Sequence, residues 1–239
     1  MPEASFHFPR GFLWGTATAA HQVEGGNTNN NWARWESEPG RIINDQKAGP
    51  ACDWWGGRWQ EDLQRAHDTG QNAHRLSIEW SRVQPAPDRW DDEALERYVE
   101  IARWLVKHRM TPMVTLHHFA DPLWLVDMGG WENDDTPAHF ARFVRRAVTA
   151  LKDYVSLWTT VNEPNVYTLS GWVEGAFPPG KSDLGAAARV LVNLIRGHTA
   201  AYRVIHELQP QALAGVATNY RSLAPAQAWT PLDKIQLRV

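Results

Sequence analysis

The sequence predicts an α/β fold, an incomplete (β/α)₈ barrel of the TIM type with about five of its eight units present. Short apolar runs alternate with segments of helical periodicity along the chain, which indicates a parallel sheet covered by helices. A doubly wound sheet would fit the same alternation. However, no GxGxxG or GxxxxGK[ST] string occurs in the 239 residues, so a nucleotide-binding version of that fold is disfavoured and the barrel is preferred.

Five runs have the composition of buried parallel strands. They read FLWGTATAA, AHRLSIEW, MVTLHHF, VSLWTTVN and ALAGVATNY, and they start at Phe12, Ala73, Met113, Val155 and Ala212. Successive units are about 50 residues long, so eight of them would need roughly 400 residues. We therefore expect residues 1–239 to form one partial barrel domain.

Four helices are predicted between these runs, over residues 58–68, 92–109, 136–153 and 183–208. In each of the two central ones, apolar residues recur at i, i+3, i+4 and i+7 and form a single stripe. Thr136 is the expected N-cap of the third helix, with Pro137 in its first turn, where a missing N–H is harmless. Pro210 closes the last helix.

Two segments do not fit this repeat. The polar, Gly- and Asn-rich stretch 25–57 is too long for an ordinary βα connection, and it is expected on the catalytic face of the barrel. The last residues, LDKIQLRV, read as the beginning of a helix.

Composition excludes several classes of protein. The chain has 24 Lys and Arg against 27 Asp and Glu, scattered along its length, so nucleic acid is not an expected partner. The single cysteine, Cys52, cannot form an intrachain disulfide, which favours a cytoplasmic location. The start, MPEASFHFPR, lacks the pattern of a signal peptide, and no apolar run approaches the ~20 residues that span a bilayer, so no membrane partner is expected.

The strongest candidate for chemistry is Glu163, in the run WTTVNEPN. Pro164 should stop the strand and leave the carboxylate at its carboxyl end, which is the active face of a parallel barrel. The alternative is that Glu163 is a solvated glutamate at a strand end with no chemical role. Other runs, however, also end in polar or aromatic side chains: His118 and Phe119 follow the third strand, and Gln22 follows the first.

The second run adds a cation. Arg75, Ser77 and Glu79 have the same parity, so Arg75 should point into the barrel. An inward arginine can hold a nucleophilic carboxylate ionised. A structural ion pair with Glu79 or another carboxylate is an equally good interpretation.

Metal and acyl-transfer chemistry are unsupported. His117 and His118 are neighbours on a strand and face opposite sides, so they cannot share one metal ion, and no HExxH motif is present. No GxSxG motif occurs, and Cys52 has no evident base partner. We expect neither a metal nor a cofactor.

Several long motifs together closely resemble the N-terminal portion of glycoside hydrolase family 1, the retaining β-glucosidases and β-glycosidases. They are FLWGTATAAHQVEGG at 12–26, RLSIEWSRVQP at 75–85, TLHHFADPLWL at 115–125 with GGW at 129–131, and TTVNEPN at 159–165. The resemblance implies that Glu163 is the general acid/base and that Asn162 binds the sugar 2-hydroxyl. It also implies that Gln22 and His118 bind the 3- and 4-hydroxyl side of the sugar.

Further positions follow from the same resemblance. Arg75 would lie beneath the nucleophile, and Phe119 occupies a position where the family often has Trp. Trp131 is a weaker candidate with a structural role. The family's nucleophile lies in an I/V-T-E-N-G motif on the seventh strand, and no TENG string exists here.

The expected activity is therefore retaining hydrolysis of a β-glucoside or β-galactoside, with the isolated chain inactive or very weak. Because a five-strand arc leaves two strand edges unpaired, self-association or a complementing C-terminal half is the expected partner, beside the carbohydrate. One alternative is a non-catalytic sugar-binding partial barrel or truncated product that self-associates. An unrelated barrel enzyme with an accidental NEP motif is a further one.

Overall fold

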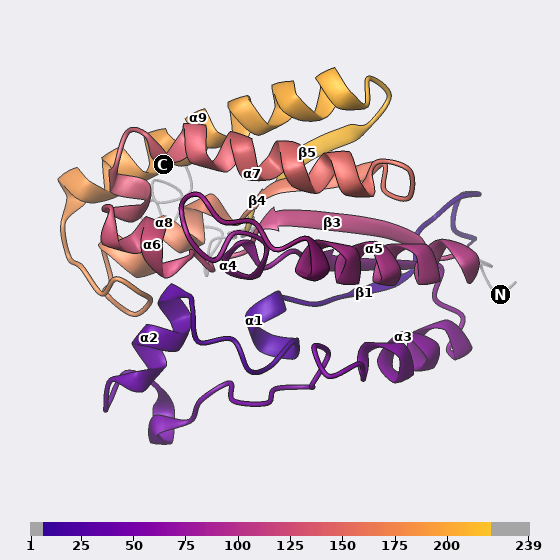
Figure 1. Cartoon of the computed structure of the whole chain (residues 1–239), viewed down its shortest axis with the longest axis horizontal. Coiled ribbons are helices and arrows are strands. Elements are labelled where there is room, and N and C mark those ends of the chain that lie inside the picture. Colours follow the sequence, from indigo (N-terminus) through magenta and orange to yellow (C-terminus); the bar gives the residue numbers. More distant parts are fainter. Residues whose placement is uncertain (1–6, 221–239) are drawn as a thin grey trace, which may run out of the picture.

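The structure is a computed structural model, and it describes residues 7–220. Five parallel strands form one sheet in the order β1-β2-β3-β4-β5 (Figure 1). The strands are β1 (Gly15–Ala17), β2 (Ala73–Ser77), β3 (Thr111–His117), β4 (Leu157–Asn162) and β5 (Leu213–Ala217). Strand order in the sheet equals strand order in the chain, as in a barrel and unlike a doubly wound sheet. The predicted fold class and all five strands are confirmed.

The four predicted helices are also present. They are α3 (Trp59–Asp68), α5 (Asp92–Lys107), α7 (Thr136–Leu151) and α9 (Leu184–Leu208). Helices α5, α7 and α9 lie side by side along one face of the sheet (Figure 1). Asp91 and Asp183 cap α5 and α9 through their carboxylates, which accept from Ala94 N and Ala186 N.

One helix start differs from the prediction. Thr136 is the first residue of α7 and not its N-cap, which is Asp135. The hydroxyl of Thr136 donates to the carbonyl of Gly130, so it is not available to cap the helix. This bond joins α7 to the preceding η2 (Gly130–Glu132).

The core lies between the sheet and these helices. Leu76, Val114, Leu116 and Trp158 point from the strands toward the helices and are buried. Residues of the other parity, such as Arg75 and Thr115, lie on the inner face of the sheet. This alternation places polar side chains on one face and apolar packing on the other.

Short helices at the carboxyl edge of the sheet were not predicted. They are α1 (Ala20–Val23), α2 (Asn31–Ser37), η1 (Ile43–Asp45), α4 (Trp80–Val83), α6 (Leu123–Asp127) and α8 (Pro164–Trp172). The long stretch 25–57 lies at this edge, as expected, because Asn31 N donates to Asp121 O (3.0 Å) and Leu123 N to Asn29 O (3.1 Å).

Both edges of the sheet are open within residues 7–220, since β1 pairs there with β2 alone and β5 with β4 alone. In the same residues, no helix is long and apolar enough to cross a membrane. The predicted helix start LDKIQLRV lies outside the described residues.

Candidate active site

Glu163 lies in the turn that joins β4 to α8. The pairing of β4 with β5 is irregular between Thr159 and Asn162, and Glu163 N donates to Ala217 O at 2.6 Å. The backbone of Glu163 is left-handed (φ 42°, ψ 58°), a strained conformation for a residue with a side chain. The ends of β4 and β5 and the start of α8 thus hold the carboxylate at the carboxyl edge, where it is partly buried and accepts from Asn219 Nδ2 (3.3 Å).

Arg75 connects three strands on the inner face of the sheet. Its Nε donates to Thr115 Oγ1 on β3 (2.7 Å) and its Nη2 to Asn162 Oδ1 on β4 (2.6 Å). Burial lowers the pKa of Arg75, and the nearby charge of Glu163 opposes that shift. The inward direction predicted for Arg75 is confirmed.

The structure does not pair Arg75 with Glu79, one of the carboxylates considered for it. Glu79 lies beyond the end of β2, where it is buried and its carboxylate accepts from Ser81 Oγ (2.6 Å). The side-chain hydrogen bonds of Arg75 go instead to neutral groups on neighbouring strands. The parity rule holds for Arg75 but does not extend to Glu79, because the strand has already ended at Ser77.

The two adjacent histidines face different surroundings, as predicted. His117 is buried, and its Nε2 lies 3.0 Å from Asp121 Oδ1. His118 is partly buried, and its pKa falls to about 4, first through burial and then through the charge of Arg75 and of His117. His118 is therefore a neutral imidazole near pH 7, which can exchange hydrogen bonds with a hydroxyl. Among residues 7–220, no three His, Cys, Asp or Glu side chains gather where they could hold a metal ion.

Phe119 and Gln22 are placed by the loops around the edge. The carbonyl of Phe119, which has φ 67°, accepts from Asn31 Nδ2 and Trp32 Nε1, both at 3.0 Å. Its ring stacks on Tyr167 at 5.8 Å between centroids. Gln22 is an exposed residue of α1, which is tied to β2 by the 2.8 Å bond from Ala20 N to Ser77 Oγ.

A buried network supports this edge and was not predicted as a unit. Asp121 accepts from Trp131 Nε1 at 3.0 Å and from the Tyr167 hydroxyl, and it contacts His117. All four side chains are buried, and Trp131 is fully enclosed. The Asp-Pro pair after the third strand was the available signal, but nothing in the sequence spacing pointed to Tyr167.

A second buried cluster lies behind α1. Glu24 accepts from Arg82 Nε (2.7 Å) and from the Tyr98 hydroxyl (2.6 Å). Burial raises the pKa of Glu24 to about 7, and burial raises that of Glu79 as well. Both carboxyls are buried and accept hydrogen bonds from the protein, although Glu79 Oε2 has no hydrogen-bond partner among the described residues.

The fold is a parallel sheet of consecutive βα units. Its inner face and carboxyl edge carry a carboxylate, an amide, a neutral imidazole and an inward arginine. This is the organisation of a (β/α)₈-barrel enzyme. The sequence profile described as Glycosyl hydrolase family 1 matches residues 4–236. The chain belongs to glycosyl hydrolase family 1, which confirms the resemblance predicted from the motifs.

Individual relatives agree with this assignment. The chain is 34% identical to Beta-glucosidase A of Acetivibrio thermocellus over 225 residues, and 35% identical to Beta-glucosidase A of Thermotoga maritima over the same length. Each alignment covers 92% of this chain and 50% of the relative. The solved structure of the Thermotoga maritima β-glucosidase in complex with castanospermine superposes with a TM-score of 0.92 at 33% identity, covering 97% of this chain and 53% of that one. The chain thus spans about half the length of the relatives it matches.

Proposed function

We propose that this chain carries the acid/base half of the active site of a retaining β-glycosidase. The observation that carries the proposal is the position of Glu163, which a strained turn holds at the carboxyl edge of a family 1 sheet. In retaining hydrolysis, one carboxyl group protonates the leaving oxygen and then, as a carboxylate, activates the water. Glu163 would perform both steps.

The neighbours of Glu163 suit a sugar substrate. The Oδ1 of Asn162 is already bonded to Arg75, which leaves its Nδ2 to donate to a sugar hydroxyl. His118 is neutral near pH 7, so it can act as donor or acceptor without adding charge. We infer that Asn162, His118 and Gln22 bind glycone hydroxyls and that Phe119 packs on the sugar.

The reaction also requires a second carboxylate, the nucleophile. A retaining glycosidase places its nucleophile about 5 Å from the acid/base. Glu24, Glu79 and Asp121 lie near this edge of the described chain, but each is buried and hydrogen-bonded to the protein. We therefore propose that the 239-residue chain alone is inactive or very weak and that the nucleophile comes from a complementing C-terminal half.

The substrate class rests on the relatives. Three of these relatives bear the names Beta-glucosidase A and 1,4-beta-D-glucan glucohydrolase. We propose a terminal β-D-glucoside or a related glycoside such as a β-galactoside as substrate.

Two measurements test this proposal. The isolated chain is assayed with an aryl β-glucoside, and no turnover is expected. A chimera then joins this chain to the second half of the Thermotoga maritima enzyme, and its folding is verified by circular dichroism. The folded chimera should hydrolyse the substrate, and Glu163→Gln should remove that activity. In Glu163→Ala, azide should restore turnover, because this anion attacks the glycosyl-enzyme directly in place of the base-activated water and releases a glycosyl azide.

Turnover by the isolated chain with a trapped covalent sugar adduct would show that a second carboxylate is already present. An unimpaired Glu163→Gln chimera would remove Glu163 from the mechanism. The alternative, a non-catalytic sugar-binding partial barrel that self-associates, is favoured by the two open sheet edges. It predicts heat on calorimetric titration with cellobiose or a glycosidase inhibitor, with no turnover in the chimera.

A further inference from the structure

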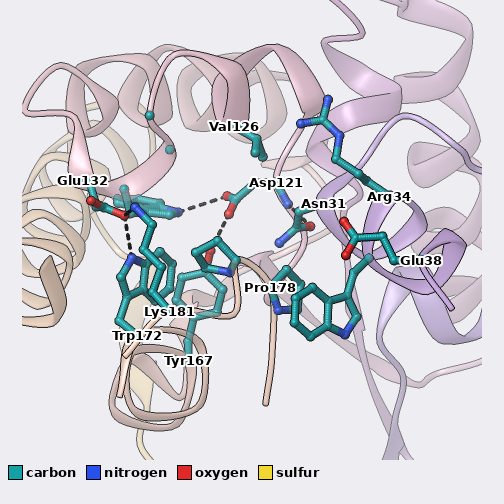
Figure 2. A pocket seen from close by; sticks show the side chains of 15 residues that line it. Asn31, Arg34, Glu38, Asp121, Val126, Glu132, Tyr167, Trp172, Pro178 and Lys181 are labelled. Carbon is teal, nitrogen blue, oxygen red and sulfur yellow. Dashed lines mark hydrogen bonds and ion pairs between the residues drawn. The ribbon is translucent and has the colours of Figure 1, made fainter. Parts of the chain in front are cut away.

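A second cavity lies to one side of the candidate active site, and we propose that it binds one neutral sugar ring. Its volume is about 320 Å³, and α2, the α6–η2 region, α8 and the turn at Pro178–Pro179 enclose it. Figure 2 shows Glu132 and Lys181 on one side of this cavity and Arg34 and Glu38 on the other, with Asp121, Tyr167 and Pro178 between them. The inference goes beyond the proposed function, because it uses neither Glu163 nor a hydrolytic step.

The charges around the cavity already have partners within the protein. Lys181 Nζ lies 2.6 Å from Glu132 Oε1. Arg34 Nη1 lies 2.7 Å from Asp127 Oδ1, and Glu38 Oε2 accepts from Arg41 Nε at 2.7 Å. A charged ligand would find no unpaired counter-ion among these groups and would compete with an existing ion pair. A neutral ligand can hydrogen-bond to the N–H groups and carboxylate lone pairs that are not engaged in the ion pairs.

Apart from the polar side chains of Asn31 and Asp121, the remaining walls are mostly aromatic or apolar. The Trp172 indole is fixed by the 2.7 Å bond from its Nε1 to Glu132 Oε1. The Trp35 side chain is mostly enclosed, and the Arg41 guanidinium covers its ring at 4.1 Å. Val126 and Pro178 add aliphatic surface.

The cavity has ion-paired charges at two ends and flat apolar walls between them. These features fit a pyranose sugar. A pyranose ring has apolar C–H faces and a rim of hydroxyls that both donate and accept hydrogen bonds. The volume is near the lower limit of small-molecule sites, about 300 Å³, so a single ring fits better than an extended oligosaccharide.

The cavity is separated from the candidate active site by a packed wall. Tyr167 and Asp121 line the cavity, and Phe119 stacks on the ring of Tyr167. Tyr167 and Asp121 are buried and bonded to each other, so they form a wall between the cavity and His118. Substitutions on one side of this wall can therefore distinguish a ligand in the cavity from one bound near His118.

The test uses the 239-residue chain and saturation-transfer NMR with methyl β-D-glucopyranoside. Val126→Trp fills the cavity, and Val106→Trp adds the same side chain at an exposed position on α5, which is not part of its wall. His118→Ala alters the candidate active site only. In a His118→Ala background, where the proposed glycone contact is removed, we expect Val126→Trp to weaken the remaining binding by roughly tenfold or more, while Val106→Trp leaves it unchanged. Thermal unfolding verifies that each variant is folded.

A second variant does not depend on filling the cavity. Lys181→Met removes an exposed ammonium and leaves Glu132 with only the more distant Arg189 Nη2, at 3.8 Å, as a cationic partner. We expect this change to favour cationic glucosamine over glucose, whereas the wild-type chain should prefer neutral glucose to both glucosamine and glucuronate.

The outcomes separate the two sites. Absence of sugar binding, or binding that survives Val126→Trp and disappears with His118→Ala, would overturn the second site; the latter result would still support the proposed function. Unchanged ligand preference in Lys181→Met would show that the ion pairs do not face the ligand and would also contradict the proposal.

Discussion

Arg75 and Asn162 are 87 positions apart in the sequence and lie on strands separated by β3, yet their side chains meet at 2.6 Å. The Arg75 guanidinium crosses the inner face of the sheet and bonds Thr115 on its way. This arrangement fixes the amide of Asn162 next to Glu163. It links the stability of the sheet to the geometry of the proposed catalytic residue.

Arg75→Met should therefore destabilise the chain. The substitution keeps an unbranched side chain but leaves the buried Asn162 Oδ1 and Thr115 Oγ1 without a donor. An unsatisfied buried polar group costs about 1–3 kcal/mol, so we expect a loss of about 2 kcal/mol in the free energy of unfolding, measured by urea denaturation. Arg65→Met is the matched control: Arg65 is exposed on α3 and its ion pairs should contribute at most about 0.5 kcal/mol. Equal losses in the two variants would contradict the role given to Arg75.

In the buried Asp121 network, loss of the shared carboxylate should lower the free energy of unfolding more than loss of a single hydroxyl. Asp121→Ala removes the acceptor for Tyr167 and Trp131 and the partner of His117, and should cost about 3–5 kcal/mol. Tyr167→Phe keeps the ring stacked on Phe119 and loses only the hydroxyl, so about 1 kcal/mol is expected.

Tyr202→Phe is the control for this pair, because its hydroxyl belongs to an exposed side chain on α9 and its loss should change stability by less than about 0.5 kcal/mol. Thermal or urea unfolding of the single and double variants measures the coupling. If Tyr167→Phe and Tyr202→Phe had the same effect, the network would not hold α8 in place.

The fold could be predicted because its signals are local. Buried strands and striped helices recur in order, and the capping carboxylates of α5 and α9 stand directly before them in the sequence. The helix α8 was missed because it has apolar residues on most sides and begins within the NEP motif, which was interpreted as the end of a strand. The exact start of α7 depended on a contact between Thr136 and Gly130, which helix patterning does not reveal.

The candidate site could be predicted in part. Parity placed Arg75 on the inner face, and Pro164 marked the end of the strand next to Glu163. The Asn162 partner of Arg75 was not predicted, because it depends on how three strands are aligned in the sheet. The left-handed backbone of Glu163 also depends on tertiary context, namely the irregular pairing of β4 with β5.

The contribution of His74 to the stability of the chain should fall as the pH drops from 6.5 to 4. Burial lowers the pKa of His74 to about 4, and its ring bonds Thr16 on β1 and Thr18 just after the end of that strand. Between the folded pKa and the unfolded value of about 6.5, the unfolded chain binds a proton that the folded chain excludes. The contribution of His74 is therefore complete above pH 6.5 and is lost, by up to about 3 kcal/mol, on acidification toward pH 4.

His74→Gln should reduce this acid loss, as measured by urea unfolding at a series of pH values. Some loss should remain, because His118 has its pKa lowered to about 4 as well. Glu24 acts in the opposite sense, since its raised pKa favours the folded state at low pH. The informative quantity is thus the difference between variant and wild type. A difference that does not change with pH would refute the assignment, and exposed His7→Gln serves as the control.

The open sheet edges predict self-association of the isolated chain. All three residues of β1 are exposed, the adjoining Trp14 is 50% exposed, and Leu213 on β5 is 69% exposed. Unpaired parallel edges with apolar side chains favour pairing with another chain, and a charge at the edge opposes it. Light scattering after size exclusion should give a mass that rises with concentration. Leu213→Lys and Trp14→Lys should lower that mass, whereas Ile43→Lys, at an exposed apolar position in η1, should not. A monomer at every concentration, or an assembly sensitive only to Ile43→Lys, would show that these edges are not the contact surface.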